Sequence, residues 1–509
     1  MADDARAHVR SFLPTSRPAD QIAPSGSESR RPSEWRGTDS WRALWTVAAV
    51  HGMELRRSEV IDDAGFAAVA RALDVVRRPL FDRPGGIRKD VAALEERIDA
   101  MMPRTMTGAA TLGLSREEWL ATTSRLLWRD TAINAVGALA DISGAVLALA
   151  EVHAVTVMPA LLGNRPAQPT TLAHFLGGLI GPLRVNGERL TEAFARLNRS
   201  PLGSGILAGD VLAADRGDLA DRLAFDGIIV NTFDALASVE DYTELLDGVA
   251  SAASILRRFV REIGLWVRTD QTSFVIDEEW TMLPEPGHPT LVLGERLDRL
   301  EACLGQVMVE ADALTARLRQ VGYGPLGSSY GWMFEAQERL DGLLEATLLE
   351  TREFVRNGLI VNRAYLGNRA GRGYTTAGDL ATFLMTEEQI APASARNIAV
   401  LVLSRVKEAN LEVGGITQDM IDSAAMMIIG QEIKVEMEAL GRFLAPRRFI
   451  ERRQVTGSAA PAMTREWLAL EGEALERQRQ WVTSRRARID ERLEAASGTI
   501  AEAAGEAAE

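Results

Sequence analysis

The sequence predicts an all-α protein built around a long central helical bundle. Only 6% of its residues are aromatic, and Ala, Leu, Arg and Glu are abundant, a composition that favours helix over sheet. Apolar residues recur at three- and four-residue spacing through stretches of about 30–40 residues, far longer than the usual globular helix. At 509 residues the chain exceeds what one hydrophobic core usually holds, so several packed regions are expected.

The N-terminal part is expected to contain an arm followed by a small domain. Residues 1–35 are rich in Ser, Pro, Arg and Asp without periodicity, which indicates an extended arm. Residues 36–110 carry the three- and four-residue apolar spacing of short amphipathic helices. They are predicted to form a small helical domain.

The central part, residues 111–362, is predicted to be the long-helix bundle. Helical patterns run through residues 117–159, 171–198 and 239–267. Their apolar positions wrap more than one face of each helix, so a single partner helix cannot cover them. We therefore expect neighbouring subunits to bury part of this surface.

The C-terminal part is predicted to contain a third helical domain and a charged tail. Residues 363–454 begin with a Gly-rich stretch and continue as compact helices. Residues 455–509 form a charged amphipathic helix with apolar residues at Trp467, Leu470, Ala474 and Leu475. This tail is expected to dock on another subunit.

Composition excludes several classes of function. A net charge of −14 and a pI near 5.1 give no basic surface for nucleic acid. The single cysteine, Cys303, and five scattered histidines offer neither a disulfide framework nor a metal cluster at a familiar spacing. We expect no cofactor, no membrane partner and a cytoplasmic location, because neither a signal peptide nor a bilayer-spanning apolar run is evident.

Four segments carry a family resemblance. They are SPLGSGILAG at 200–209, AEVHAVTVMPALLGNRPAQPTTLAHFL at 150–176, FDGIIVNTFDALASVEDY at 225–242 and GYTTAGDLATFL at 373–384. Together they resemble the argininosuccinate lyase branch of the aspartase/fumarase superfamily. The resemblance implies a three-domain all-α homotetramer that acts on a small molecule. It also implies active sites assembled from three chains, and a β-elimination that yields fumarate.

The first turn of the resembled site is altered. The family carries Ser-Arg-Asn-Asp-Gln there, and this chain keeps Ser115 and Arg116 but has Glu117, Glu118 and Trp119 in place of the other three. The resemblance makes Ser115 and Arg116 candidate substrate-binding residues. Two new carboxylates would repel an anionic substrate, and both are candidate acid/base groups.

The second and third turns lose the catalytic residues of the family. Gly163 stands where the resemblance places a catalytic histidine, which a glycine cannot replace in proton transfer. In the loop 278–289, Trp280 and Thr281 align with the two serines of the family. Pro286 aligns with its lysine, and His288 with its asparagine.

Candidate residues for a remodelled site follow from these alignments. The candidate catalytic residues are Thr281, Glu285, His288, Glu117 and Glu118, and the candidate substrate-binding residues are Ser115, Arg116, Arg165, Gln168, Ser200, Asn231 and Trp280. The arginines could bind a carboxylate through two parallel hydrogen bonds. The helical histidines His51, His153 and His174 are expected to be structural.

Three interpretations of the function remain open from the sequence. The first is a lyase, or an enzyme of the reverse addition, that acts on a C–N or C–O bond of a less anionic substrate, as in specialised metabolism. The second is an inactive scaffold that keeps only the fold. The third is a cyclase or isomerase, since the superfamily also contains a cycloisomerase of carboxymuconate, and such reactions need only proton transfer in a shaped pocket.

Overall fold

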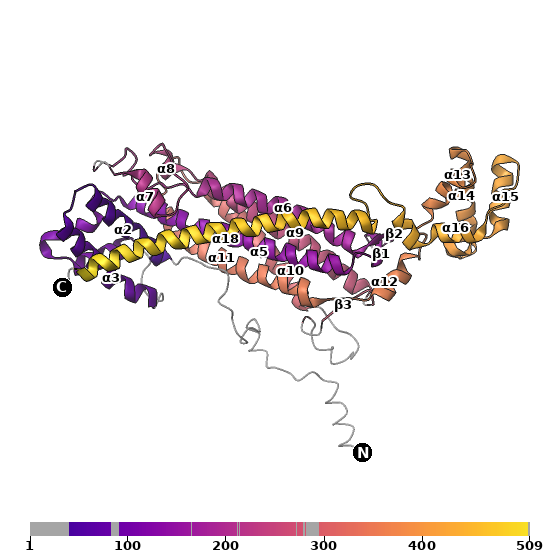
Figure 1. Cartoon of the computed structure of the whole chain (residues 1–509), viewed down its shortest axis with the longest axis horizontal. Helices are drawn as coiled ribbons and strands as arrows, with labels where there is room; N and C mark the ends of the chain where they lie inside the picture. Colours follow the sequence, from indigo (N-terminus) through magenta and orange to yellow (C-terminus); the bar gives the residue numbers. More distant parts are fainter. Residues whose placement is uncertain are drawn as a thin grey trace, which may run out of the picture.

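A computed structural model describes residues 40–82, 91–163, 165–210, 212, 214–270, 272–277, 280 and 295–506. Within these residues the chain is almost entirely helical, with two short two-stranded sheets. The prediction of an all-α fold is confirmed. The molecule is elongated, with a small helical domain at one end, a bundle in the middle and another small domain at the far end (Figure 1).

The first small domain packs against one end of the bundle. It contains α2 (Ser40–Arg57), α3 (Asp63–Asp82) and α4 (Val91–Met101), followed by the 3-10 turns η2 (Arg104–Met106) and η3 (Ala109–Thr111). Its core contains the aromatic side chains of Trp41, Trp45 and Phe66 among aliphatic residues. The buried indole of Trp45 donates a hydrogen bond to the carbonyl of Leu73 at 2.9 Å, which joins α2 to α3.

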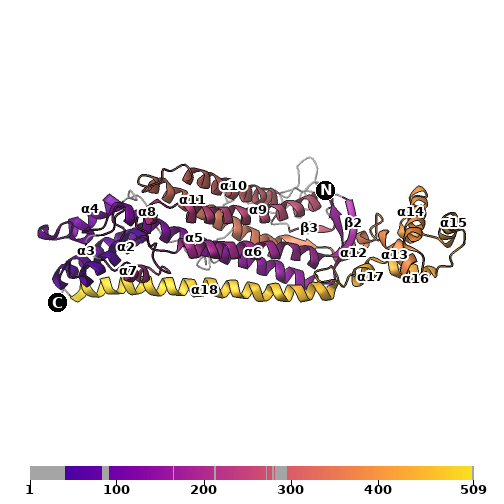
Figure 2. The same cartoon turned by 90° about the horizontal axis from the view of Figure 1, so that it is seen from above.

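Five long helices form the bundle. They are α5 (Arg116–Val152), α6 (Leu172–Leu197), α9 (Glu240–Thr269), α10 (Glu295–Leu318) and α11 (Ser329–Glu353). Helix α5 lies against α6 and α11, while α9 packs between α6 and α10. The five helices run side by side along the long axis of the molecule (Figures 1 and 2).

The connections between these helices gather at the two ends of the bundle. The antiparallel hairpin β1 (Val157–Leu162) and β2 (Arg165–Thr171) joins α5 to α6. The short helices α7 (Arg216–Arg222) and α8 (Asp234–Ala237) connect α6 to α9 in the chain. They lie at the end of the bundle opposite the hairpin (Figure 1). On the hairpin side, β3 (Phe274–Ile276) pairs with β4 (Leu359–Val361) after the π-helical turn η5 (Phe354–Gly358).

The third domain extends beyond the hairpin end. It contains α12 (Arg363–Ala370), α13 (Gly378–Thr386), α14 (Pro392–Glu408), the 3-10 turn η6 (Val413–Gly415), α15 (Gln418–Ile429), α16 (Met437–Leu444) and α17 (Pro446–Glu451). Most of these helices share an apolar core of their own. The carboxylate of Asp379 on α13 accepts hydrogen bonds from Arg452 and Arg453 at 2.7–3.0 Å, which ties α13 to the segment after α17.

The C-terminal segment returns along the whole bundle as α18 (Pro461–Glu506). It lies over α5 and α6 and reaches α2 and α3 of the first domain (Figure 2). The prediction that this helix docks on another subunit is therefore wrong for its main apolar face, which contacts helices of its own chain. Leu475 is buried there, whereas Leu470, predicted to dock, is 59% exposed.

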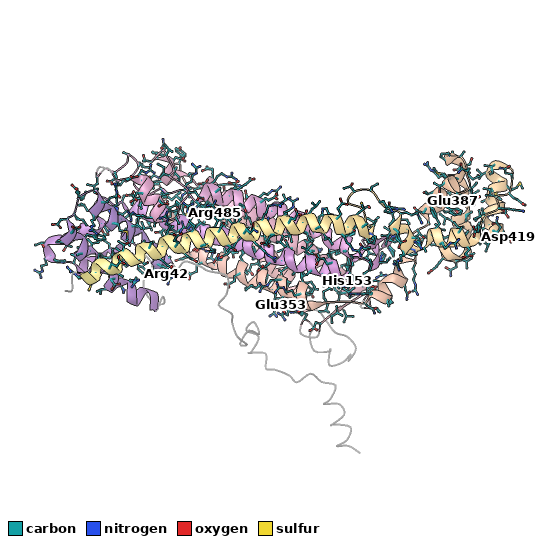
Figure 3. The ribbon with its side chains drawn as sticks, viewed as in Figure 1. Arg42, His153, Glu353, Glu387, Asp419 and Arg485 are labelled. Carbon is teal, nitrogen blue, oxygen red and sulfur yellow. The ribbon has the colours of Figure 1, made fainter. Side chains whose placement is uncertain are left out.

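Close packing and ion pairs both hold α18 in place. A side chain at Gly177 of α6 would meet the ring of Trp467 at 2.7 Å, so the absence of a Cβ makes room for the indole. Towards the other end, Arg485 (labelled in Figure 3) pairs with Asp226 at 2.9 Å. The buried carboxylate of Asp130 accepts a hydrogen bond from Arg486 at 2.9 Å. The charged residues of the tail thus serve its attachment.

The apolar character of α5 is explained by partners in the same chain. Among the described helices, α5 alone is long and apolar enough to cross a bilayer, judged by length and composition only. Its most apolar stretch is 61% buried, and α5 contacts α2, α6, α11 and α18. Helices of the same chain thus cover much of α5, and burial of the remainder by a neighbouring subunit stays a prediction.

A pH dependence of stability arises at the junction of the first domain and the bundle. His51 is buried, and its Nε2 lies 2.9 Å from the carbonyl oxygen of Leu112. Burial lowers the pKa of His51 below its ordinary 6.5, although the Leu112 carbonyl and the charges of Asp210 and Glu54 act in the opposite direction. The imidazole is therefore neutral in the folded chain near neutral pH.

Acidification from about pH 6.5 is expected to destabilise the chain through His51. Below this pH the unfolded chain binds a proton at the imidazole and the folded chain does not, so the free energy of unfolding falls as pH decreases. Thermal unfolding of the wild type and His51→Gln, followed across this range, measures the contribution. Equal slopes of melting temperature against pH in the two proteins would contradict the assignment.

Candidate active site

The first candidate turn is a helix cap. Ser115 is the N-cap of α5, and its hydroxyl accepts a hydrogen bond from the Glu118 amide at 3.2 Å while it donates to the Gly205 carbonyl at 2.6 Å. In return, the Glu118 carboxylate accepts from the Ser115 amide at 2.7 Å. This is a complete capping box. It fixes the start of α5, and it occupies the Ser115 hydroxyl.

Glu118 has a structural role where a catalytic role was predicted. Its carboxylate also accepts hydrogen bonds from the backbone amides of Gly203 and Gly205 at 2.8 and 3.1 Å, and the residue is only 2% exposed. Burial raises the pKa of Glu118, against the lowering effect of these amides. The carboxylate thus anchors the turn 200–205 to α5. The Ser-x-x-Glu pattern at 115–118 was the sequence signal for this role.

Glu117 and Arg116 point to other neighbours. The Glu117 carboxylate accepts a hydrogen bond from the Gly327 amide at 3.1 Å, in the loop before α11. Arg116 pairs with Glu95 of α4 at 3.0 Å, and its side chain is 66% exposed. Of the three charged residues in the turn, only Glu118 is fully buried, so Arg116 and Glu117 keep accessible surface for a ligand.

Ser200 and Asn231 also hold local structure. Ser200 is completely buried, and its hydroxyl accepts a hydrogen bond from the Leu202 amide at 3.2 Å. It cannot contact a ligand from this position, which corrects its assignment as a substrate-binding residue. The side-chain oxygen of Asn231 accepts from the amides of Phe233 and Asp234 at the start of α8, yet Asn231 itself is exposed.

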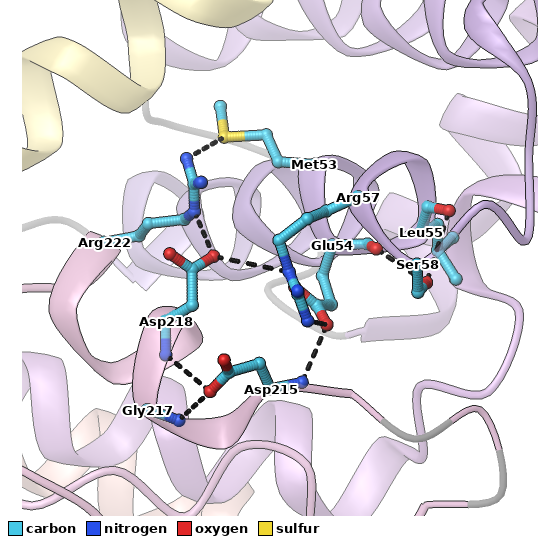
Figure 4. Close-up of polar contacts among 9 residues, drawn as sticks. All are labelled: Met53, Glu54, Leu55, Arg57, Ser58, Asp215, Gly217, Asp218 and Arg222. Atoms are coloured by element: carbon cyan, nitrogen blue, oxygen red, sulfur yellow. Dashed lines mark hydrogen bonds and ion pairs between the residues drawn. The ribbon is translucent and has the colours of Figure 1, made fainter.

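Hydrogen bonds from the Arg216 side chain stabilise the turn 200–205. The guanidinium of Arg216 donates to the carbonyls of Leu202 and Ile229 at 3.1 and 2.8 Å, and burial lowers the pKa of this arginine. Next to it, Asp215 caps α7 and its own amide donates to buried Glu54 of α2 at 2.7 Å (Figure 4). These contacts fix the backbone at this end of the bundle. We call the surface formed by Ser115 and the turn 200–205 the platform.

Exposed apolar side chains surround this platform, and sequence reasoning missed them. Tyr323 is 86% exposed and stacks on Phe233 with ring centroids 5.6 Å apart. Ile206 and Val230 are 70% and 79% exposed. We call these four residues the apolar rim. The signal available in the sequence was an aromatic residue within the Gly- and Pro-containing loop VGYGPLG at 321–327.

The second candidate turn lies at the tip of the β1–β2 hairpin. Gly163 has a left-handed backbone with φ of 59°, and no atom lies within 4 Å of where a Cβ would stand. Arg165 and Gln168 are exposed on β2, and Arg165 has no ion pair among the described residues. The hairpin therefore presents a cation and an amide to its surroundings. Both residues remain predicted substrate-binding residues.

Most of the third candidate turn lies outside the described residues, including Thr281, Glu285 and His288. Trp280 is described and is only 1% exposed. The Arg296 guanidinium lies 4.0 Å from the centroid of its ring, and Phe354 packs at 5.1 Å. Trp280 thus belongs to the main hydrophobic core, which corrects its assignment as a substrate-binding residue.

The histidines of the bundle serve the fold. Nδ1 of His153 lies 3.0 Å from the Thr156 hydroxyl, and burial lowers the pKa of this histidine. His174 lies 3.0 Å from the Thr170 hydroxyl through Nδ1 and 3.2 Å from the Gly457 carbonyl through Nε2. Over the described part of the chain, no group of His, Cys, Asp and Glu could hold a metal ion.

The candidate residues divide between opposite ends of the bundle. Ser115, Glu117, Asn231 and the apolar rim lie at the end with α7 and α8, and Arg165 and Gln168 lie at the hairpin end (Figure 1). Helix α5 alone separates the two ends by about 55 Å, since its 37 residues rise about 1.5 Å each. No pocket within one chain can include both groups.

Comparisons with known proteins identify relatives of this architecture. A family model described as Lyase matches residues 48–279. The argininosuccinate lyase of Methanocorpusculum labreanum is 27% identical over 82% of this chain and 84% of its own. That of Methanosarcina barkeri is 24% identical over 90% of this chain and 92% of its own.

Solved structures share the fold at lower identity. EDDS lyase in complex with formate superposes with a TM-score of 0.81 at 21% identity, covering 92% of each chain. The 3-carboxy-cis,cis-muconate lactonizing enzyme from Pseudomonas putida gives a TM-score of 0.64 at 17% identity, over 87% of this chain and 96% of that one. The family model, the sequence matches and the shared fold together support a place for this chain in the aspartase/fumarase superfamily of lyases, in its argininosuccinate lyase-like branch.

Proposed function

We propose that this chain is a cytoplasmic C–N or C–O lyase, or the enzyme of the reverse addition, with a substrate that is less anionic than argininosuccinate. It acts in specialised metabolism as a homotetramer whose active sites lie between subunits. The proposal of a site shared between subunits rests on one observation: the candidate residues lie at opposite ends of α5. A neighbouring subunit must bring its hairpin end to the platform at Ser115 for one pocket to form.

The residues at the two ends of the bundle are suited to different parts of the substrate. Arg165 has no ion pair among the described residues, so its guanidinium can bind a substrate carboxylate through two parallel hydrogen bonds. The apolar rim suits an uncharged or aromatic part of the substrate. Glu117 favours a cationic or neutral group nearby over a second carboxylate.

The proton transfer is assigned to the loop 278–289. An elimination needs a base that removes the proton next to the carboxylate and a donor for the leaving group. Gly163 has no side chain that could transfer a proton, and the carboxylate of Glu118 is engaged in hydrogen bonds with backbone amides, so neither residue is assigned to this step. Thr281, Glu285 and His288 are the residues of this loop that we assign to the step.

A substrate panel tests the reaction. The purified protein is mixed with argininosuccinate, EDDS and a series of N- and O-substituted succinates and their monoamides, and the unsaturated product is followed by its absorbance. We expect turnover of a monoanionic member and none of argininosuccinate. Preferred cleavage of argininosuccinate would overturn the proposed substrate class, and no turnover in either direction would support the inactive scaffold.

Co-expression of two impaired variants is expected to restore activity. Arg165→Ala and Tyr323→Ala alter exposed residues at opposite ends, and each is expected to lower kcat/KM about 10²-fold by misplacing the substrate. In a mixed tetramer some sites receive both intact residues, so co-expression recovers activity with the substrate found above. Mixtures of Arg165→Ala with Arg165→Lys, which alter the same end, are the control. Mixed tetramers without recovery would contradict a shared site.

A further inference from the structure

A cavity of about 420 Å³ lies within the third domain, and no residue of the proposed lyase site lines it. It opens between the turn after α12, the loop at η6 and the helix α16, at the far end of the molecule in Figure 1. Its volume is in the range of pockets that bind small molecules. Neither the family resemblance nor the proposed elimination accounts for it.

The floor of the cavity is apolar and buried. Val413 and Ile416 contribute from the η6 loop, and Leu440 and Leu444 contribute from α16. Each of these residues is at most 7% exposed, and all four belong to the core of the third domain. The floor can therefore take up an aliphatic side chain without any change in the fold.

The rim of the cavity carries two opposite charges that have no partner in the described structure. Arg372 and Glu412 are exposed, both line the cavity, and neither forms an ion pair with the other or with any described residue. Thr376 is only 2% exposed and also lines the cavity, so it adds a polar residue between the two charges and the apolar floor.

The rim is held in a defined conformation. The Tyr374 hydroxyl donates a hydrogen bond to the Leu411 carbonyl at 2.8 Å, which ties the turn after α12 to the η6 loop. Gly373 and Tyr374 both have left-handed backbones, with φ of 71° and 66°. A left-handed tyrosine is uncommon and persists only where its surroundings fix it. Arg372 and Glu412 are thereby held on facing segments.

We infer that this cavity binds a small α-amino acid with an aliphatic side chain. The Arg372 guanidinium and the Thr376 hydroxyl donate hydrogen bonds to its carboxylate, and the Glu412 carboxylate accepts from its ammonium group. The aliphatic side chain lies on the floor of the cavity. A ligand with one charge leaves either Arg372 or Glu412 without a partner, so the zwitterion is the chemical class that satisfies both.

Binding to the wild-type protein tests the ligand class. Isothermal titration of the full-length protein is carried out with L-leucine, with 4-methylpentanoate, which lacks the ammonium group, and with 3-methylbutylamine, which lacks the carboxylate. L-leucine is expected to bind saturably, and each analogue about ten-fold more weakly or worse, because each loses charge-assisted hydrogen bonds. No saturable heat with L-leucine, or equal affinity for an analogue, overturns the inference.

Matched variants test the residues. Arg372→Gln and Glu412→Gln are each expected to weaken L-leucine binding about ten-fold or more. Arg396→Gln and Glu408→Gln change exposed residues of α14 in the same domain and should bind as the wild type does. The thermal unfolding of all four variants is measured alongside, and Thr376→Val repeats the test with a nearly isosteric change. Wild-type affinity in Arg372→Gln and Glu412→Gln overturns the assignment.

Discussion

Glu118→Ala is expected to lower the free energy of unfolding by about 3–5 kcal/mol, the largest effect anticipated for a single residue of the candidate site. The carboxylate accepts hydrogen bonds from the amides of Ser115, Gly203 and Gly205, and it is buried. Its removal leaves three backbone donors without an acceptor, at about 1–3 kcal/mol each before water enters. Urea unfolding at fixed protein concentration measures the loss.

The neighbouring Glu117→Ala is the matched control. Glu117 is half-buried and accepts one hydrogen bond, from the Gly327 amide. It is expected to lower the free energy of unfolding by no more than about 1 kcal/mol. If instead Glu118→Ala folds as stably as the wild type and loses only turnover, Glu118 is a catalytic residue and its assignment as a cap fails.

Leu468→Ala on α18 is expected to lower the free energy of unfolding by about 2–5 kcal/mol. Leu468 is 3% exposed and belongs to the main core of the chain, against which α18 packs. Its truncation leaves a cavity between α18 and the bundle. Because the helix also reaches α2 and α3, the first domain should lose protection from hydrogen exchange together with α18.

The outward-facing leucine two positions along the same helix provides the comparison. Leu470 is 59% exposed, so Leu470→Ala should change the free energy of unfolding by no more than about 0.5 kcal/mol in the isolated chain. A large loss of stability in Leu470→Ala, accompanied by dissociation into smaller species, would show that this residue contacts another subunit, as the sequence alone predicted.

Much of the architecture could be predicted from the sequence because it depends on local pattern. Long stretches with three- and four-residue apolar spacing give long helices whatever surrounds them, and α5, α6 and α9 have 37, 26 and 30 residues. The matching segments around Ser200 and Thr376 identified the superfamily, because such runs of small and polar residues form specific turns.

The candidate site was less predictable because side-chain direction is a tertiary property. Glu118 and Glu117 are adjacent, yet one faces the buried amides of Gly203 and Gly205 while the other reaches Gly327. In the sequence, only the Ser-x-x-Glu spacing at 115–118 separates them, and it predicts the helix cap without the contacts to Gly203 and Gly205. The same applies to Trp280, whose ring contacts Arg296 and Phe354, residues far from it in the sequence.

The sequence by itself determined the helical class, the long helices and the resemblance to the superfamily. Only the tertiary structure decided what each apolar face contacts. It placed α18 on α5 and α6 of its own chain, and it separated Ser115 from Arg165 by the length of α5. Periodicity states that a face must be buried and is silent on the partner, because any complementary apolar surface satisfies the hydrophobic effect equally well.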